Sequence, residues 1–208
     1  MTGRFITLEG GEGAGKSTQA KRLAAALHSR GIECIVTREP GGSPGAEEIR
    51  KLLVEGAPGR WDAVTETLLL FAARADHIAR KIKPALADGK WVISDRFTDS
   101  TYAYQGAGRG LDRETIRRIE AASTHAFEPE LTLVLDLPSE TGLARAHARN
   151  TGETRFEGFD LAFHTRLREA FREIVQREPD RCVLIDATGT EDRVAELIWR
   201  AVSGKFNI

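Results

Sequence analysis

A glycine-rich stretch near the N-terminus contains the residue types and the spacing that most directly suggest chemistry. Residues 10–17 read Gly-Gly-Glu-Gly-Ala-Gly-Lys-Ser and match the pattern G-x-x-x-x-G-K-[ST] in full. In such a loop the glycines let backbone N–H groups face phosphate oxygens, the lysine reaches the β- and γ-phosphates, and the serine hydroxyl binds Mg²⁺. The alternative is a strand-to-helix turn without a ligand. The pattern predicts a nucleotide-phosphate site formed by Gly10, Gly11, Glu12, Gly13, Ala14, Gly15, Lys16, Ser17 and Thr18.

One carboxylate and three arginines are the next candidates. Asp95 lies just past the apolar run 91–93, where a carboxylate can hold Mg²⁺ through water, although it could also be an ordinary turn residue. Arg38 and Arg96 follow two predicted strands, and Arg74 lies in a helical segment. Guanidinium groups bind phosphate with two parallel hydrogen bonds, so converging arginines favour an acceptor that already carries a phosphate. Surface ion pairs are the alternative for each arginine.

An aromatic residue and an arginine share a face of the same helical segment. Phe71 and Arg74 are three positions apart, which places them on one side of a helix. A ring and a guanidinium so arranged could stack on a base and bond its edge. The alternative is that Phe71 belongs to the core together with Leu68 and Ala72.

The elements that must position these residues alternate along the chain. Five short, continuous apolar runs are typical of strands buried on both faces: 5–8, 32–36, 91–93, 131–135 and 182–185. Helical spacing of apolar residues occurs between them, and the segment 65–88 is predicted to be kinked or divided at Pro84. Irregular structure is expected at 39–45, 56–61, 97–110 and 150–158. The alternation predicts a parallel sheet covered by helices, with ligands at its carboxyl edge.

Length and composition limit the possible classes of protein. The chain has 208 residues, which predicts a single domain over 1–208. Lys plus Arg total 30 and Asp plus Glu total 31, a net charge of −1 that argues against wrapping nucleic acid by charge. We expect no membrane span and no signal peptide, and two scattered cysteines predict a cytoplasmic protein without disulfides. The only asparagines are Asn150 and Asn207, so the guanine-reading N-K-x-D motif is absent.

Several motifs, in order along the chain, resemble the bacterial thymidylate kinase family. They are Glu9-Gly10 with the glycine-rich loop through Thr18, the stretch 37–42 (Thr-Arg-Glu-Pro-Gly-Gly), 70–74 (Leu-Phe-Ala-Ala-Arg), 95–97 (Asp-Arg-Phe) and 100–106 (Ser-Thr-Tyr-Ala-Tyr-Gln-Gly). The second and the last two are far more specific than the phosphate loop. The match covers nearly the whole chain.

The resemblance implies transfer of the ATP γ-phosphate to thymidine monophosphate, with Mg²⁺, in a homodimer. It implies a P-loop sheet of strand order 2-3-1-4-5.

By position, the resemblance also implies roles for individual residues. The catalytic residues would be Lys16, Arg96, Arg149 and Glu12, and the metal would be bound by Ser17 and Asp95. Glu12 would approach the sugar 3′-hydroxyl, and Tyr104 would lie under the deoxyribose, where a 2′-hydroxyl would clash. The remaining substrate contacts would be Arg38, Phe71, Arg74, Ser100, Thr101 and Gln105.

The resemblance also implies a mobile lid, here at 145–157. The phosphate loop contains no arginine, so a transition-state cation is expected from Arg145, Arg149 or Arg155 in that lid, with Arg149 the best placed. Three alternatives remain at this point. They are another nucleoside or nucleoside monophosphate kinase, a P-loop ATPase coupled to a macromolecular partner, and a nucleotide-binding module without catalysis.

Overall fold

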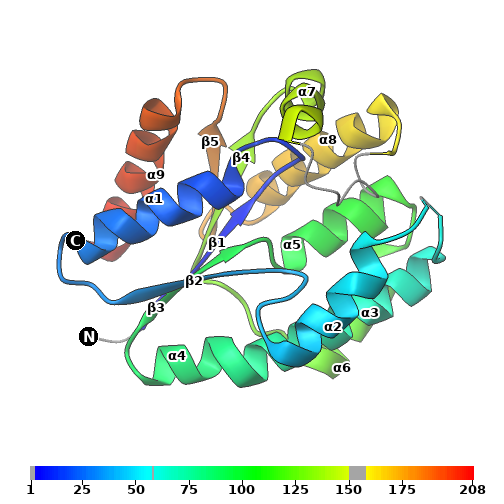
Figure 1. The fold of residues 1–208 in the computed structure, drawn as a ribbon, viewed down its shortest axis with the longest axis horizontal. Helices are drawn as coiled ribbons and strands as arrows, with labels where there is room; N and C mark the ends of the chain where they lie inside the picture. The colour runs from blue at the N-terminus through cyan, green and yellow to red at the C-terminus, as the bar shows by residue number, and fades with distance from the viewer. Residues whose placement is uncertain (1–2, 58, 150–157) are drawn as a thin grey trace.

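A five-stranded parallel sheet forms the centre of the molecule (Figure 1). The computed structural model describes residues 3–57, 59–149 and 158–208. The sheet has the order β2-β3-β1-β4-β5, which confirms the predicted fold class and strand order. Each predicted apolar run lies in or overlaps a strand. The strands are β1 (Phe5–Glu9), β2 (Cys34–Arg38), β3 (Trp91–Asp95), β4 (Leu131–Asp136) and β5 (Cys182–Asp186).

Helices cover both faces of this sheet, as the buried central strands β1, β3 and β4 require, whereas the edge strands β2 and β5 are partly exposed. The α-helices are α1 (Lys16–His28), α2 (Pro44–Val54), α3 (Ala63–His77), α4 (Lys83–Ala87), α5 (Thr98–Thr101), α6 (Arg113–Thr124), α7 (Ser139–Arg149), α8 (Leu161–Arg177) and α9 (Glu191–Phe206). Two segments are π-helical, η1 (Ile78–Ile82) and η2 (Tyr102–Gly108).

The core is divided by the alternation of side chains along the strands. Ile6 and Leu8 of β1 pack in the cluster that α1 and α9 cover. Phe5 points the other way, into a smaller cluster with Ile82 and Phe97. In Figure 1, α1 and α9 lie together on one side of the sheet, and α4 lies on the opposite side. The sheet edge that carries the predicted site is therefore held rigidly between two packed layers.

The long predicted helix is continuous over 63–87, with a π-helical segment just before Pro84. α3 begins after Asp62, whose side chain accepts a hydrogen bond from the Thr65 N–H, and the helix continues through η1 into α4. Pro84 lies in the first turn of α4, where its missing N–H costs least. The π-helical segment η1 lies directly before Pro84, and its backbone hydrogen bonds join residues five positions apart instead of four.

One prediction about the connecting segments is wrong. Residues 97–110 were expected to be irregular, but α5 and η2 occupy most of this stretch. Three glycines in the stretch suggest a loop, yet tertiary contacts stabilise helix: the Tyr104 ring packs against Phe163 and Phe171 of α8 at 6.1 and 6.5 Å between centroids. Packing against a neighbouring helix outweighs local propensity here.

Among the described residues, no helix is both long enough and apolar enough to cross a bilayer.

A close approach between α7 and the phosphate loop gives a prediction about stability. A Cβ on Gly142 of α7 would overlap the Glu12 carbonyl oxygen, and a Cβ on Gly13 would overlap that of Gly142. We expect Gly142→Ala to lower the free energy of unfolding by about 1–3 kcal/mol, because backbone must move to admit a methyl group. Urea denaturation monitored by circular dichroism measures this change.

Gly204 of α9 provides the matched control. It is also a helical glycine, but a Cβ there would have no heavy atom within 4 Å. Gly204→Ala should therefore raise the free energy of unfolding by about 0.5–1 kcal/mol, through helix propensity alone. Equal effects of the two substitutions would contradict the proposed close packing of α7 on the loop.

Candidate active site

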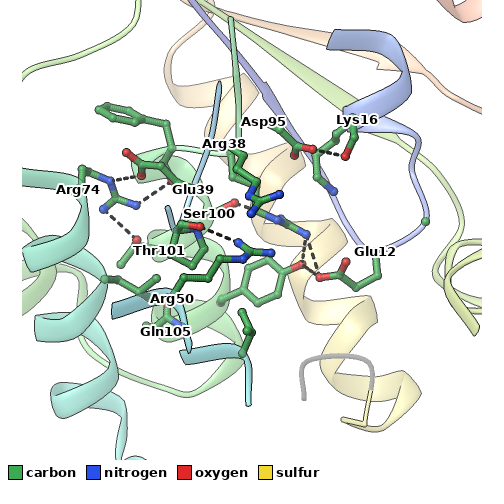
Figure 2. A pocket seen from close by; sticks show the side chains of 18 of the residues that line it. Glu12, Lys16, Arg38, Glu39, Arg50, Arg74, Asp95, Ser100, Thr101 and Gln105 are labelled. Atoms are coloured by element: carbon green, nitrogen blue, oxygen red, sulfur yellow. Dashed lines mark hydrogen bonds and ion pairs between the residues drawn. The ribbon is translucent and has the colours of Figure 1, made fainter. Parts of the chain in front are cut away.

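A cavity of about 280 Å³ opens at the carboxyl edge of the sheet (Figure 2). The strand register brings its parts together, because Asp95 of β3 pairs with Leu8 of β1 on one side and with Arg38 of β2 on the other. The cavity wall contains thirteen of the predicted site residues: Glu12, Gly13, Gly15, Lys16, Ser17, Arg38, Arg74, Asp95, Arg96, Ser100, Thr101, Tyr104 and Gln105. The predicted residues Gly10, Gly11, Ala14, Thr18 and Phe71 do not line it.

The phosphate loop has the backbone conformation that its glycines allow. Gly13 and Gly15 have φ values of 69° and 93°, in the left-handed region that glycine adopts without strain. α1 begins directly after Gly15, and no side chain caps its N-terminus. The first N–H groups of this 13-residue helix are therefore available for an anion, and the helix dipole favours one.

Lys16 and Ser17 begin α1 at one end of the cavity. The Lys16 ammonium donates to the carbonyl oxygens of Gly10 and Gly11 at 3.1 and 2.8 Å, so its charge lies inside the loop. Burial, together with the nearby Arg96 cation, lowers the pKa of Lys16 to about 8. The Ser17 hydroxyl donates to a carboxylate oxygen of Asp95. A hydroxyl and a carboxylate are hard oxygen ligands, and their convergence fits a site for Mg²⁺.

Arg96 connects the loop to the helical segment after β3. Its guanidinium donates to the Gly10 carbonyl at 3.0 Å, to Glu12 Oε1 at 2.8 Å, to the Ser100 hydroxyl at 3.1 Å and to the Tyr104 hydroxyl at 2.9 Å. Tyr104 in turn donates to Glu12 Oε1 at 2.7 Å. Burial raises the pKa of Glu12, but Arg96 and Lys16 outweigh it and bring that pKa down to about 2. Glu12 is therefore a carboxylate at neutral pH.

Glu9 supports Arg96 from behind. Arg96 has a φ of 73°, an uncommon conformation for a residue with a side chain. The buried carboxylate of Glu9 accepts hydrogen bonds from the Phe97 N–H at 2.7 Å and from the Ser100 hydroxyl at 2.6 Å, directly after this turn. Burial, reinforced by the nearby Asp99 carboxylate, raises the pKa of Glu9 to about 7.

Arg74 is held at the opposite end of the cavity. Its side chain is 2% exposed, and it donates to Glu39 Oε2 at 2.7 Å, to the Thr101 hydroxyl at 3.1 Å and to the Phe97 carbonyl at 3.2 Å. The second Glu39 oxygen lies 2.9 Å from Nδ1 of the buried His77. The guanidinium is thus fixed in one orientation before any ligand binds.

Phe71 does not lie where the sequence interpretation placed it. Its side chain is 1% exposed, and the Arg74 guanidinium carbon lies over its ring, 4.6 Å from the centroid. The core alternative is therefore the one that the geometry favours. Leu70, four residues before Arg74 on α3, lines the cavity instead.

The arginines in the middle of the cavity differ in how they are held. Arg38 is exposed, and its guanidinium lies 3.2 Å from Glu47 Oε2. Arg50 of α2 donates to the Pro40 carbonyl at 2.6 Å and also lines the cavity. Figure 2 shows Arg38 and Arg50 between the Lys16–Asp95 end and the Arg74–Thr101 end.

Sequence reasoning missed Glu39, Arg50 and Leu70 as wall residues. Glu39 follows Arg38 within the specific Arg-Glu-Pro-Gly-Gly stretch, so that motif was an available signal. Arg50 lies on α2, which was not predicted as a helix although Pro44 precedes the apolar positions of this segment.

Part of the predicted lid lies outside the described residues. The gap covers residues 150–157 and so includes Arg155. Arg149 ends α7, and its side chain is not described, whereas Arg145 is an exposed residue of α7. The expectation that one of these arginines supplies a transition-state cation therefore stays a prediction.

Comparisons with known proteins identify the family. The family model described as thymidylate kinase matches residues 8–198. A thymidylate kinase of Caulobacter vibrioides is 58% identical over 206 residues, covering 99% of both chains, and one of Jannaschia sp. is 54% identical and covers 97% of both. The crystal structure of thymidylate kinase from Ehrlichia chaffeensis superposes with a TM-score of 0.78 at 32% identity, covering 97% of this chain and 99% of that one. With nearly the whole chain aligned and the phosphate loop matched in full, this protein belongs to the thymidylate kinase family.

Proposed function

We propose that this protein transfers the γ-phosphoryl group of ATP to thymidine monophosphate, forming thymidine diphosphate and ADP. The observation that carries the proposal is one continuous cavity with a phosphate loop at one end, a buried arginine at the other and further arginines between them (Figure 2). None of the cited relatives supports the alternatives that the sequence left open.

The phosphate loop would hold the ATP phosphates. The Lys16 ammonium and the first N–H groups of α1 supply positive charge where the transferring group would lie. Ser17 and Asp95 would hold Mg²⁺, which when bound neutralises phosphate charge. A single protein carboxylate suits this ion, because Mg²⁺ usually keeps waters and substrate phosphates as its other ligands.

The middle of the cavity would hold the acceptor phosphate. Arg38 and Arg96, with Arg50 beside them, present guanidinium groups there. A phosphate is already a nucleophile, so the acceptor needs positioning rather than a general base. Arg96 is fixed by four hydrogen bonds before substrate arrives, and little ordering remains to be done on binding.

The sugar and the base would lie beyond that phosphate. The Glu12 carboxylate would accept from the 3′-hydroxyl, with Ser100 close by, and the Tyr104 ring would leave no room for a 2′-hydroxyl. Arg74, Thr101 and Gln105 would meet the edge of the base, and Leu70 would cover part of its face in place of Phe71.

We further propose the homodimer that the resemblance implies, with α2 and α3 at the contact. Leu52, Val64 and Leu68 on these helices are 39%, 44% and 51% exposed, so this pair of helices offers apolar side chains to a partner. Leu68→Glu should shift the protein toward monomer in sedimentation velocity, because a buried charge opposes association. Leu161→Glu, at a 43% exposed leucine on α8, is the matched control and should leave the dimer intact.

An acceptor screen tests the proposed reaction. With Mg-ATP, thymidine monophosphate should be the best acceptor among the nucleoside monophosphates, and thymidine itself should be a poor one because it lacks the charge that the arginines bind. The measurement is ADP release with each acceptor. Equal use of thymidine and its monophosphate as acceptors would contradict the proposal that Arg38 and Arg96 bind the acceptor phosphate.

Lys16→Ala should lower transfer by about two to three orders of magnitude while the melting temperature stays near that of the parent.

The low pKa of Lys16 predicts a pH dependence of ATP binding. The ammonium form of Lys16 is present below pH 8 and is lost above it, and phosphate favours that form. The Kd for Mg-ATP should therefore rise about tenfold between pH 7 and pH 9, with proton uptake on binding at the higher pH.

Isothermal titration calorimetry in buffers of different ionisation enthalpy measures both quantities. Lys16→Arg is the control. A guanidinium stays charged over this range, so the Kd of this variant for Mg-ATP should not change between pH 7 and pH 9. If the Kd of the parent protein for Mg-ATP is also independent of pH over this range, Lys16 is not the group that titrates.

A further inference from the structure

We propose that Glu66, buried behind the cavity wall, is a positioning residue that selects the base by fixing the side-chain amide of Gln105. The inference deepens the proposed function and rests on it. Glu66 lies on α3 one turn before Leu70, and its side chain is fully buried. Nothing in the sequence motifs singled it out, because a glutamate near a helix start usually serves the helix dipole.

The first observation is the orientation of Gln105. This residue lies on the cavity wall and is 1% exposed. Its Nε2 donates to Glu66 Oε1 at 2.8 Å, whereas its Oε1 has no hydrogen-bond partner among the described residues. A carboxylate can only accept, so Glu66 forces the nitrogen of the Gln105 amide toward itself. The orientation of the amide is thus determined by chemistry rather than left free to flip.

The second observation is how Glu66 itself is held. Its other oxygen, Oε2, forms an ion pair with Nη1 of Arg109 at 2.9 Å. Arg109 in turn donates to the Trp61 carbonyl at 2.6 Å, which ties it to the segment before α3. The arginine neutralises a charge that would otherwise be costly to bury.

Together these contacts give this end of the cavity a fixed pattern of donors and acceptors. Arg74 carries only donors, and Gln105 contributes an acceptor that still lacks a partner. Figure 2 shows Arg74, Thr101 and Gln105 at the same end of the cavity. A pyrimidine with a ring N–H beside a carbonyl matches this pattern, as in thymine. Cytosine offers an amino group and an unprotonated ring nitrogen, which would set donor against donor and acceptor against acceptor.

Glu66→Gln tests the inference, because it should invert the pattern. Arg109 can only donate, so it would take the new amide oxygen and turn the new NH₂ group toward Gln105. Gln105 would then rotate and present a donor to the base. We expect the ratio of kcat/KM for thymidine monophosphate to that for deoxycytidine monophosphate to fall by about tenfold or more, with deoxycytidine monophosphate used better than by the parent. The KM for ATP should not change.

A second buried glutamate supplies the control. Glu120 of α6 accepts from the Tyr102 hydroxyl at 2.6 Å and does not line the cavity, so Glu120→Gln should leave the ratio within about twofold of the parent value. In a Gln105→Ala background, Glu66→Gln should change the ratio no further, because its effect passes through the Gln105 amide.

Distinct results separate the possible failures. A parent enzyme that does not prefer thymidine monophosphate would contradict the proposed function. A parent that prefers it, with a folded Glu66→Gln variant of unchanged ratio, would overturn the role of Glu66, as would an equal effect in the Gln105→Ala background. If Glu66→Gln does not fold, Glu66→Asp removes the contact by shortening the side chain, and an unchanged ratio in that variant is equally decisive.

Discussion

The candidate site depends on the hydrogen bonds that the guanidinium of Arg96 makes. This guanidinium bonds the phosphate loop through Gly10 and Glu12 and the helical segment after β3 through Ser100 and Tyr104. Two parts of the chain that are more than eighty residues apart are thereby fixed to each other. The backbone conformation that allows this, with φ at 73°, carries a strain of about 1–3 kcal/mol. The hydrogen bonds from Phe97 and Ser100 to Glu9 maintain the turn against that strain.

Three buried carboxylates, one in the cavity wall and two behind it, share one task in this protein. Glu9 supports the turn at Arg96, Glu39 orients Arg74, and Glu66 orients Gln105. Each carboxylate is deeply buried and therefore needs hydrogen-bond donors, and Ser100, Arg74 and Gln105, which line the cavity, supply one to each. The hydrogen bonds that satisfy these buried acids also hold the cavity-lining side chains in one orientation. Less ordering of those side chains is then needed when a ligand binds.

The phosphate loop also depends on α7, none of whose described side chains lines the cavity. α7 approaches the loop so closely that glycine is required on both sides of the contact, at Gly13 and at Gly142. The last part of α7, residues 145–149, belongs to the region predicted to form the lid. The backbones of this helix and the loop are therefore packed directly against each other, with no side chain between them at these two glycines.

The sequence by itself determined the five strands, their parallel arrangement and the convergence of Lys16, Arg38, Asp95 and Arg96 at one sheet edge. These features follow from local apolar runs and from the rule that parallel strands present their carboxyl ends together. Only the tertiary structure decided that Phe71 belongs to the core while Leu70 lines the cavity, because which side of a helix is buried depends on its neighbours. It also decided that most of 97–110 is helical and that Glu39 and Glu66 orient Arg74 and Gln105, since those contacts join residues about thirty or more positions apart in the chain.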